Sequence, residues 1–208
     1  KNVIYTMRYF AILLFLFFST LYSLGESNPD SFQTGLTFKA HTYNQDERTA
    51  LNLTPDQPFR FNNSYALNFK MKHLAQEHTY GYVFRFVIND TIHLDMVTNI
   101  NGSKINFILG CRQSVSSNTE FIQQECLNQW LDVDVSITKD RLQFCINGKK
   151  QSVSNPYKQI KDIKILFGQN KHPLFFTTDV PPITIKEISI YSDNQKIRLW
   201  DMWKHRNN

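Results

Sequence analysis

The sequence is poor in glycine and cysteine, and it contains no run of basic residues. Its 208 residues include 7 Gly and 3 Cys, against 17 Phe and 9 Tyr. So little glycine excludes a collagen-like or low-complexity chain, and the many aromatic residues favour packed β-sheets. The net charge of +5 is mild and dispersed along the chain. A nucleic-acid-binding protein is therefore not indicated.

Motifs of the common enzyme classes are also missing. There is no Gly-x-Ser-x-Gly, no His-Glu-x-x-His and no glycine-rich loop of the kind that binds phosphate. No Cys-x-x-Cys or Cys/His spacing suits zinc, and the 6 histidines carry no ligand spacing. These absences argue against hydrolases, zinc proteases and nucleotide-binding enzymes of the familiar types. We predict that the protein is not an enzyme.

The only long hydrophobic run lies near the N-terminus. Residues 9–22 are almost entirely apolar, and basic residues precede them. Ser23 and Gly25 then place small residues at positions −3 and −1 of a cleavage site after Gly25. This pattern is typical of a secretory signal peptide, and the run is shorter than the roughly 20 residues of a membrane-spanning helix. We predict a signal peptide over residues 1–25 and an exported domain over 26–208. That domain would lie in the periplasm, at the cell surface or outside the cell.

Three cysteines are an odd number for an exported protein. Cys111 and Cys126 bracket a polar loop of Ser, Asn and Gln, and a disulfide between them would close that loop. Loop-closure entropy gives such a bond about 3 kcal/mol. Cys145 would then be unpaired, and we interpret it as a small strand residue rather than a reactive thiol.

Alternation of apolar and polar residues predicts about a dozen strands and no convincing helix. The expected strands are 35–41, 58–61, 65–72, 82–88, 92–96, 104–109, 130–138, 142–146, 149–153, 162–167, 183–191 and 196–200. Asn89-Asp90 and Asn147-Gly148 are typical hairpin turns. Many short strands separated by turns predict an all-β fold, a two-sheet antiparallel jelly-roll sandwich.

One segment, residues 165–191, combines an apolar strand, a long polar excursion and a second strand rich in isoleucine. Gly168 allows the backbone to turn at the end of the first strand. Pro181-Pro182 cannot donate to a strand ladder, so pairing can begin only after it. The apolar spacing changes phase between Ile185 and Ile188, which predicts a β-bulge.

Several of these stretches together resemble a known family. Tyr80-Gly81-Tyr82-Val83-Phe84-Arg85-Phe86, then the strand led by Trp130, then Phe144-Cys145-Ile146-Asn147-Gly148-Lys149 are similar to laminin G-like domains. Those domains belong to the concanavalin A-like lectin/glucanase jelly rolls. Residues 167–182 with 188–191 look like N-terminal modules of exported bacterial kelch-repeat proteins. The resemblance spans 35–205 and implies a carbohydrate or protein ligand, and a propeller domain downstream in the full-length protein.

The same superfamily contains glucanases, which need two carboxylates on either side of the scissile bond. The related enzymes carry Glu-x-Asp-x-x-Glu on one strand, whereas His93-Leu94-Asp95 and Asp132-Val133-Asp134 have no Glu in register. We interpret Asp132 and Asp134 as a solvated pair on one strand face. We therefore expect a non-catalytic module that binds carbohydrate or protein, or docks a neighbouring domain. The alternatives are a glycoside hydrolase-like enzyme and an inert spacer domain.

A sugar site would combine planar polar side chains with an aromatic ring. Arg85, His93 and Asp95 share the outer face of the 82–96 hairpin, where they would be cross-strand neighbours in a charged patch. We predict that they bind the ligand, with Trp130 as the aromatic candidate. The alternative is a plain surface ion pair worth at most about 1 kcal/mol.

Calcium is the ion that the resemblance implies. Asp90, Asp95 and Asp179 with Asn170 would supply oxygen ligands if the fold gathers them. The alternative is structural, because Asp179 can cap the turn before Pro181 and Asp90 belongs to a hairpin turn. No other cofactor is expected.

Overall fold

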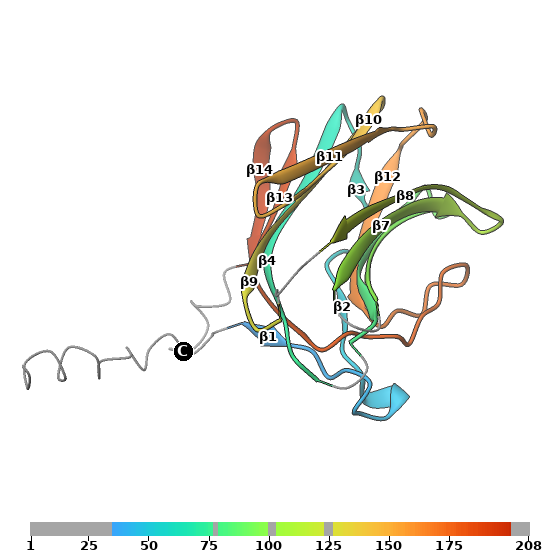
Figure 1. Cartoon of the computed structure of the whole chain (residues 1–208). Coiled ribbons are helices and arrows are strands. Elements are labelled where there is room, and N and C mark those ends of the chain that lie inside the picture. The colour runs from blue at the N-terminus through green and yellow to red at the C-terminus, as the bar shows by residue number, and fades with distance from the viewer. Residues whose placement is uncertain (1–34, 77–78, 100–102, 123–126, 201–208) are drawn as a thin grey trace, which may run out of the picture. The chain divides into compact units, whose positions relative to one another are not determined.

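Strands form nearly all of the regular secondary structure in the computed structural model, which describes residues 35–76, 79–99, 103–122 and 127–200 (Figure 1). Sheet A contains, in spatial order, β1 (Leu36–Thr37), β13 (Ile183–Ser192), β4 (Ser64–His73), β9 (Trp130–Thr138), β10 (Arg141–Ile146) and β11 (Lys149–Ser154), and β14 (Gln195–Trp200) also pairs with β13. Sheet B contains β2 (Ala50–Asn52), β12 (Asp162–Gly168), β5 (Gly81–Ile88), β6 (Ile92–Thr98), β7 (Lys104–Cys111) and β8 (Ser114–Ile122), and β3 (Phe59–Arg60) also pairs with β12.

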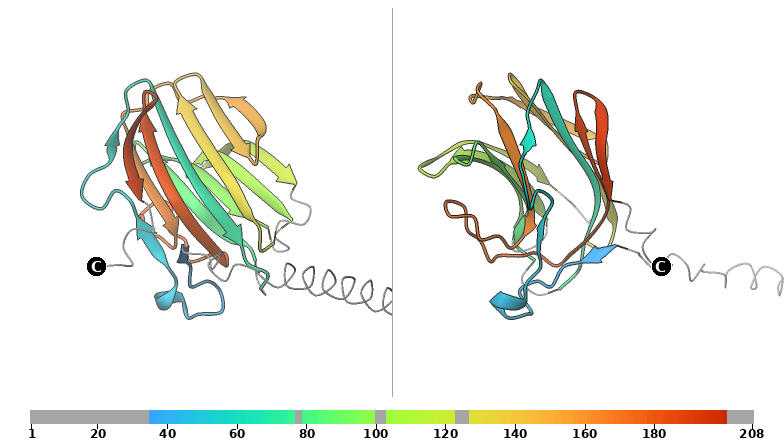
Figure 2. Two further views of the ribbon diagram at one scale, coloured as in Figure 1. Left: turned by 90° about the vertical axis from the view of Figure 1, so that its left-hand side faces the viewer. Right: turned by 180° about the vertical axis from the view of Figure 1, so that it is seen from behind.

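The two sheets face each other as layers, and their neighbouring strands pair antiparallel (Figure 2). This confirms the predicted two-sheet antiparallel sandwich. The described residues contain one helical turn, η2 (Gln45–Glu47). Nothing among the described residues could cross a bilayer as a helix.

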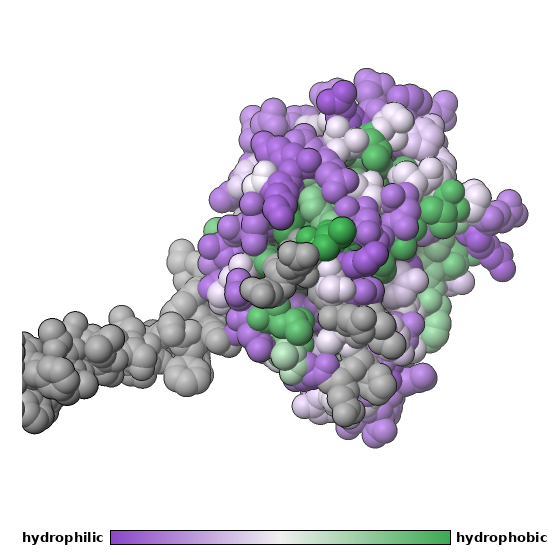
Figure 3. Space-filling model, viewed as in Figure 1, coloured by the Kyte–Doolittle hydropathy of each residue, from purple (hydrophilic) through white to green (hydrophobic). Residues whose placement is uncertain are grey.

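Aromatic side chains fill the space between the sheets. Phe107 of sheet B stacks on Phe144 of sheet A with ring centres 4.3 Å apart. Phe69 of sheet A meets Phe84 and Phe167 of sheet B edge-on, at 5.9 and 5.3 Å. Each such pair adds about 0.5–1.5 kcal/mol beyond the area it buries. The alternating pattern thus places most of its apolar side chains inside, and the face shown in Figure 3 is mainly polar with scattered apolar patches.

Two of the hairpin turns have the backbone that their sequences predict. Asn89 and Asp90 have φ of 51° and 59°, and Asn147 and Gly148 have φ of 47° and 79°. Two successive residues with positive φ are typical of type I′ turns, whose twist matches that of the flanking strands. These turns fix the register of β5 with β6 and of β10 with β11.

The segment from β12 to β13 also follows its prediction. Gly168 has φ of 67°, and a Cβ there would lie 2.4 Å from the carbonyl oxygen of Thr49. The register of β13 against β4 shifts between Lys186 and Ser189, where Glu187 has φ of 54°. This shift is the predicted bulge. Residues 169–182 connect the two strands, and therefore the two sheets.

The polar stretch between Cys111 and Cys126 is not the loop that the sequence predicts, because most of it is strand β8. This strand lies at the edge of sheet B, and only Thr119 and Phe121 of its side chains are buried. An edge strand that is exposed at most positions has mainly polar residues, like a loop. It therefore lacks the alternation of apolar and polar residues that predicts a strand. Near the start of the domain, the expected strand 35–41 is shorter than predicted, because only Leu36–Thr37 form β1.

The predicted disulfide is not formed among the described residues. Cys111 is a free thiol whose Sγ lies 3.5 Å from Ser114 Oγ across the tight β7–β8 turn. Its expected partner, Cys126, lies outside the described residues, as does the predicted signal peptide over 1–25. Cys145 is a buried free thiol in β10, which agrees with its interpretation as a small strand residue.

Candidate functional site

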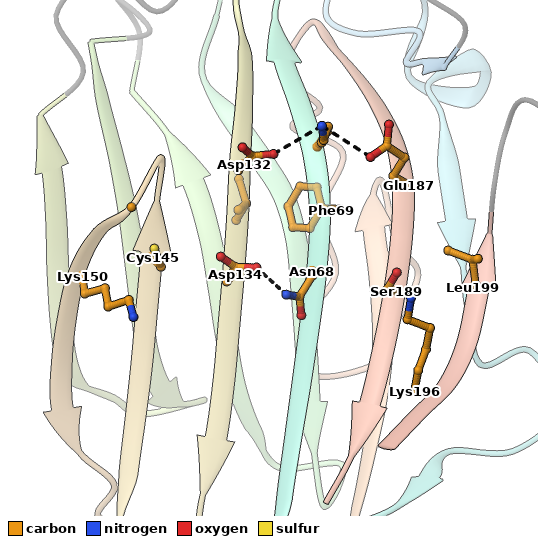
Figure 4. Close-up of a pocket in the computed structure, with 13 residues that line it drawn as sticks. Asn68, Phe69, Asp132, Asp134, Cys145, Lys150, Glu187, Ser189, Lys196 and Leu199 are labelled. Atoms are coloured by element: carbon orange, nitrogen blue, oxygen red, sulfur yellow. Dashed lines mark hydrogen bonds and ion pairs between the residues drawn. The ribbon is translucent and has the colours of Figure 1, made fainter. Parts of the chain in front are cut away.

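An open groove of about 770 Å³ crosses the outer face of sheet A. Its walls come from β4, β9, β10, β11, β13 and β14 (Figure 4). The side chains that line it are mainly polar: Asn68, Lys70, Asp132, Asp134, Cys145, Lys150, Glu187, Ser189, Lys196 and Leu199. We call this surface the sheet A groove.

Strand register explains why these side chains meet. Asn68 of β4 is paired with Asp134 of β9 on one side and with Ser189 of β13 on the other. Lys70 of β4 is paired with Asp132 in the next row. Directly paired residues point to the same face of a sheet, so both rows face outward. Glu187 joins them because the bulge in β13 turns its side chain toward this face (Figure 4).

One row of the groove is a weak ion network. The Lys70 ammonium lies 3.8 Å from Asp132 and 3.5 Å from Glu187. The three side chains are 39%, 67% and 41% exposed. Exposed pairs of this kind contribute at most about 1 kcal/mol each. These groups can therefore exchange their partners for polar groups of a ligand at little cost.

The second row is more enclosed. The Asn68 side-chain amide donates to Asp134, while Asn68 Oδ1 is buried without a hydrogen-bond partner among the described residues. Burial raises the pKa of the Asp134 carboxyl above its ordinary value, and the charge of Asp132 raises it further. The groove thus offers an unused acceptor beside a carboxyl that ionises with difficulty. Such groups suit hydroxyl groups, which both donate and accept.

The outer face of sheet B holds the residues that the sequence singled out. Arg85 and Asp95 are directly paired, as predicted, and they form two bonds: Nε–Oδ1 at 2.5 Å and Nη2–Oδ2 at 2.7 Å. His93 Nδ1 lies 2.9 Å from Asp95 Oδ2. The pair is not the exposed patch that the sequence predicts, however, because Arg85 is 5% and Asp95 2% exposed.

Residues 169–182 cover this pair. The carbonyl of Phe175 accepts a hydrogen bond from Arg85 Nη1, and the guanidinium carbon lies 5.5 Å from the Phe175 ring and 4.6 Å from the Tyr82 ring. Burial alone would lower the pKa of Arg85, but its bonds to Asp95 raise it, so the guanidinium stays charged. Arg85 and Asp95 therefore hold a chain segment in place. We call Arg85, Asp95 and Phe175 the sheet B clamp.

The structure does not gather the predicted calcium ligands. Among the described residues, no three His, Cys, Asp or Glu side chains lie close enough together to hold a metal ion. Asp95 is in the clamp, and Asp90 pairs with Lys164, whose Nζ is 2.6 Å away. That hydrogen bond holds the pKa of Asp90 below its ordinary value. Asn170 Oδ1 accepts from the His172 amide. The amide of Asp179 donates to Thr177 Oγ1.

Trp130 lies on sheet A, away from the clamp and on the same strand face as Asp132. Its ring is flanked by the ammonium groups of Lys72 and Lys186, at 5.4 and 4.2 Å. The predicted grouping of Trp130 with Arg85 is therefore not formed. Asn68 and Lys70 of β4 were not among the predicted site residues, although polar and apolar residues alternate along this strand.

No family model matches the sequence, and no curated protein matches it. Solved structures do match the fold. Domains LG4-5 of the mouse laminin alpha1 chain align with a TM-score of 0.56 and 12% identity, covering 82% of this chain and 44% of that one. Alginate lyase A1-II′, of polysaccharide lyase family 7, aligns with a TM-score of 0.54 and 12% identity, over 72% and 73% of the two chains. A pentraxin from Limulus polyphemus aligns with a TM-score of 0.50 and 14% identity, over 84% and 75%.

The fold is a concanavalin A-like jelly roll. This confirms the predicted fold class. The chain spans less than half the length of the laminin structure that it matches. At such identities the similarity is one of fold, and jelly rolls of this type include enzymes and non-enzymes alike.

Proposed function

We propose that this jelly roll is an exported, non-catalytic module that binds a saccharide in the sheet A groove. The observation that carries the proposal is the enclosed row of the groove, where Asn68 has an unused acceptor beside Asp134. A saccharide hydroxyl can donate to Asn68 while it accepts from a neighbouring donor. Carbohydrate binding also agrees with the fold, which this chain shares with an alginate lyase solved with substrate.

The charge and length of the groove favour an extended chain of low charge. Three lysines, at 70, 150 and 196, face three carboxylates, at 132, 134 and 187, so the lining is balanced overall. The groove runs across neighbouring strands from β11 to β14, a width of about 24 Å at the usual strand spacing. That length accommodates several sugar units, with Trp130 on the same face for apolar contact.

Export rests on the predicted signal peptide over residues 1–25 and is part of the proposal. A propeller domain downstream remains a prediction from the resemblance to kelch-repeat proteins. A protein ligand, or docking of that domain, is the alternative occupant of the groove. An inert spacer would need neither the groove nor the unpaired Asn68 acceptor.

One observation favours a second function, glycoside hydrolysis. Asp134, whose pKa is raised, lies two residues from Asp132 on the same face. Residues so placed are roughly 7 Å apart along a strand, within the range of about 6.5–9.5 Å between the carboxyl groups of inverting glycosidases. Asp134 would then be the acid and Asp132 the base. Lys70 Nζ lies 3.8 Å from the Asp132 carboxylate.

A glycan array with residues 26–208 tests the main proposal, run with calcium and with a chelator. We expect specific binding that does not require calcium, and about tenfold weaker binding in Asn68→Ala for each hydrogen bond lost. Lys104→Ala is the matched control, since its ion pair with Glu120 lies on sheet B. Release of reducing ends from a bound glycan would support the hydrolase instead. A blank array with folded protein would contradict saccharide binding.

A further inference from the structure

A second pocket, of about 490 Å³, lies at the β2 edge of sheet B, well apart from the sheet A groove. It is enclosed by the loop of residues 53–58 on one side and by residues 169–172 on the other. Its size is within the range of about 300–1,000 Å³ that is usual for small-molecule sites. We propose that this pocket binds a single neutral sugar ring, independently of the groove.

Two neighbouring carboxamides lie in the wall of this pocket. Gln169 and Asn170 line the pocket and are 8% and 6% exposed. The His172 amide donates to Asn170 Oδ1, which fixes the orientation of this carboxamide. Asn170 Nδ2 is left as a buried donor without a partner among the described residues. Buried polar groups are nearly always satisfied in native proteins, so an unpaired one calls for a missing acceptor.

The rest of the pocket wall is partly apolar. Leu166, Pro55 and Pro58 provide this surface beside the carboxamides, whereas the Leu51 side chain packs against the core between the sheets. A sugar ring presents apolar C–H groups on its faces and hydroxyls at its edge. Apolar wall and carboxamides together therefore match one ring better than an apolar ligand or an ion.

Two basic side chains of the pocket already have an acidic partner. Lys164 lies 2.6 Å from Asp90, and His172 Nε2 lies 3.6 Å from the same carboxylate. Asp56 and Lys171, of opposite charge, are exposed at the pocket. Neither sign of charge prevails, so a neutral ligand is favoured over a carboxylate or a phosphate.

The walls are held before a ligand arrives. The Leu53 amide donates to the carbonyl of Ile165 at 3.0 Å, and the Ile165 amide donates to Thr54 Oγ1 at 3.2 Å. On the other side, Asn170 and Thr177 exchange two backbone hydrogen bonds of 3.1 Å. Both walls are thus fixed by their own contacts, and a preorganised site loses little entropy on binding.

Asn170→Asp is the sharpest test, because it keeps the acceptor for the His172 amide and replaces only the unpaired donor. Asn118→Asp on β8 is the matched control, because Asn118 is exposed, lines neither pocket and likewise keeps the acceptor for its one bond, from Asn106 Nδ2. We would titrate the exported form of the chain with glucose, galactose, mannose and N-acetylglucosamine and follow binding by calorimetry and by saturation-transfer NMR. We expect at least one sugar to bind, at least tenfold weaker in Asn170→Asp, with Asn118→Asp unchanged.

Three results would overturn the second site. They are no binding of any of these sugars, equal affinity in Asn170→Asp, and binding lost in Asn68→Ala but kept in Asn170→Asp. The last would place the sugar in the groove. If Asn170→Asp does not fold, Gln169→Glu is the second variant, with the same expected loss. Because the two pockets lie on different sheets, failure of this site leaves the groove proposal standing, and the reverse holds as well.

Discussion

Strands of both sheets alternate polar and apolar residues, but their outward polar side chains differ in solvent exposure. On sheet A the outward ion network stays accessible, with the side chains of Lys70 and Asp132 39% and 67% exposed. On sheet B the outward Arg85 and Asp95 are 5% and 2% exposed, because Phe175 lies over them. A polar residue on the outer face of a strand is therefore free for a ligand only if no distant segment covers it.

The largest expected effect comes from breaking the sheet B clamp. Arg85→Ala leaves Asp95 buried without its partner, and such a change costs about 3–5 kcal/mol in the free energy of unfolding. Lys70→Ala breaks both exposed ion pairs of the sheet A network and should cost no more than about 2 kcal/mol. Urea unfolding of both variants measures the difference. Equal and small losses would show that the clamp does not stabilise the fold.

The covering residue should be nearly as important as the pair beneath it. Phe175 is 6% exposed and packs with Val87 and Leu166 on the outer side of sheet B. Phe175→Ala should cost about 3 kcal/mol, as for other buried phenylalanines. Amide exchange of residues 169–182 should rise in this variant, whereas that of β4 and β9 should not. Unchanged exchange in 169–182 would mean that the segment is held by other contacts.

The two faces should also differ in the pH dependence of stability. Asp90, near the clamp, has a pKa lowered by its hydrogen bond to Lys164 from an ordinary value of 3.8. Its contribution is present above that value and is lost as the pH falls through the folded pKa. Asp90→Asn should thus be less stable than the parent at pH 7, by less than about 1 kcal/mol because the pair is exposed. The difference should vanish in strong acid.

Asp134, in the sheet A groove, should show the opposite sign. Its pKa is raised by burial and by Asp132, so the folded state binds more protons than the unfolded state above pH 3.8. Stability therefore falls as the pH rises through the folded pKa. Asp134→Asn should be slightly more stable than the parent at pH 7 and equal to it in strong acid. Parallel melts of both Asn variants check the sign, and a destabilised Asp134→Asn would contradict the cause given for its pKa.

The fold could be predicted from sequence because most strands bury one face and so alternate clearly. Strand β8 could not, because it buries only two side chains at a sheet edge. The Arg85–Asp95 pair was predictable from the tight Asn89-Asp90 hairpin. Its burial was not, since it depends on a side chain 90 residues away.

Only part of the groove could be predicted from the sequence, for the same reason. Asp132 and Asp134 stand out as an alternating acidic pair, but their partners Asn68 and Lys70 lie on a strand more than sixty residues earlier. Glu187 reaches the groove only through a bulge. Strand register and bulge geometry, which no local pattern contains, assemble this site.

The central claim is that sheet A presents a ligand surface and that the outer face of sheet B at Arg85 is structural. The most direct test is amide chemical-shift mapping of the labelled protein with an oligosaccharide selected by the glycan array. The largest shifts should fall on β4, β9 and β13, around Asn68, Asp134 and Ser189. Shifts centred instead on Arg85, His93 and the segment covering them would contradict the account.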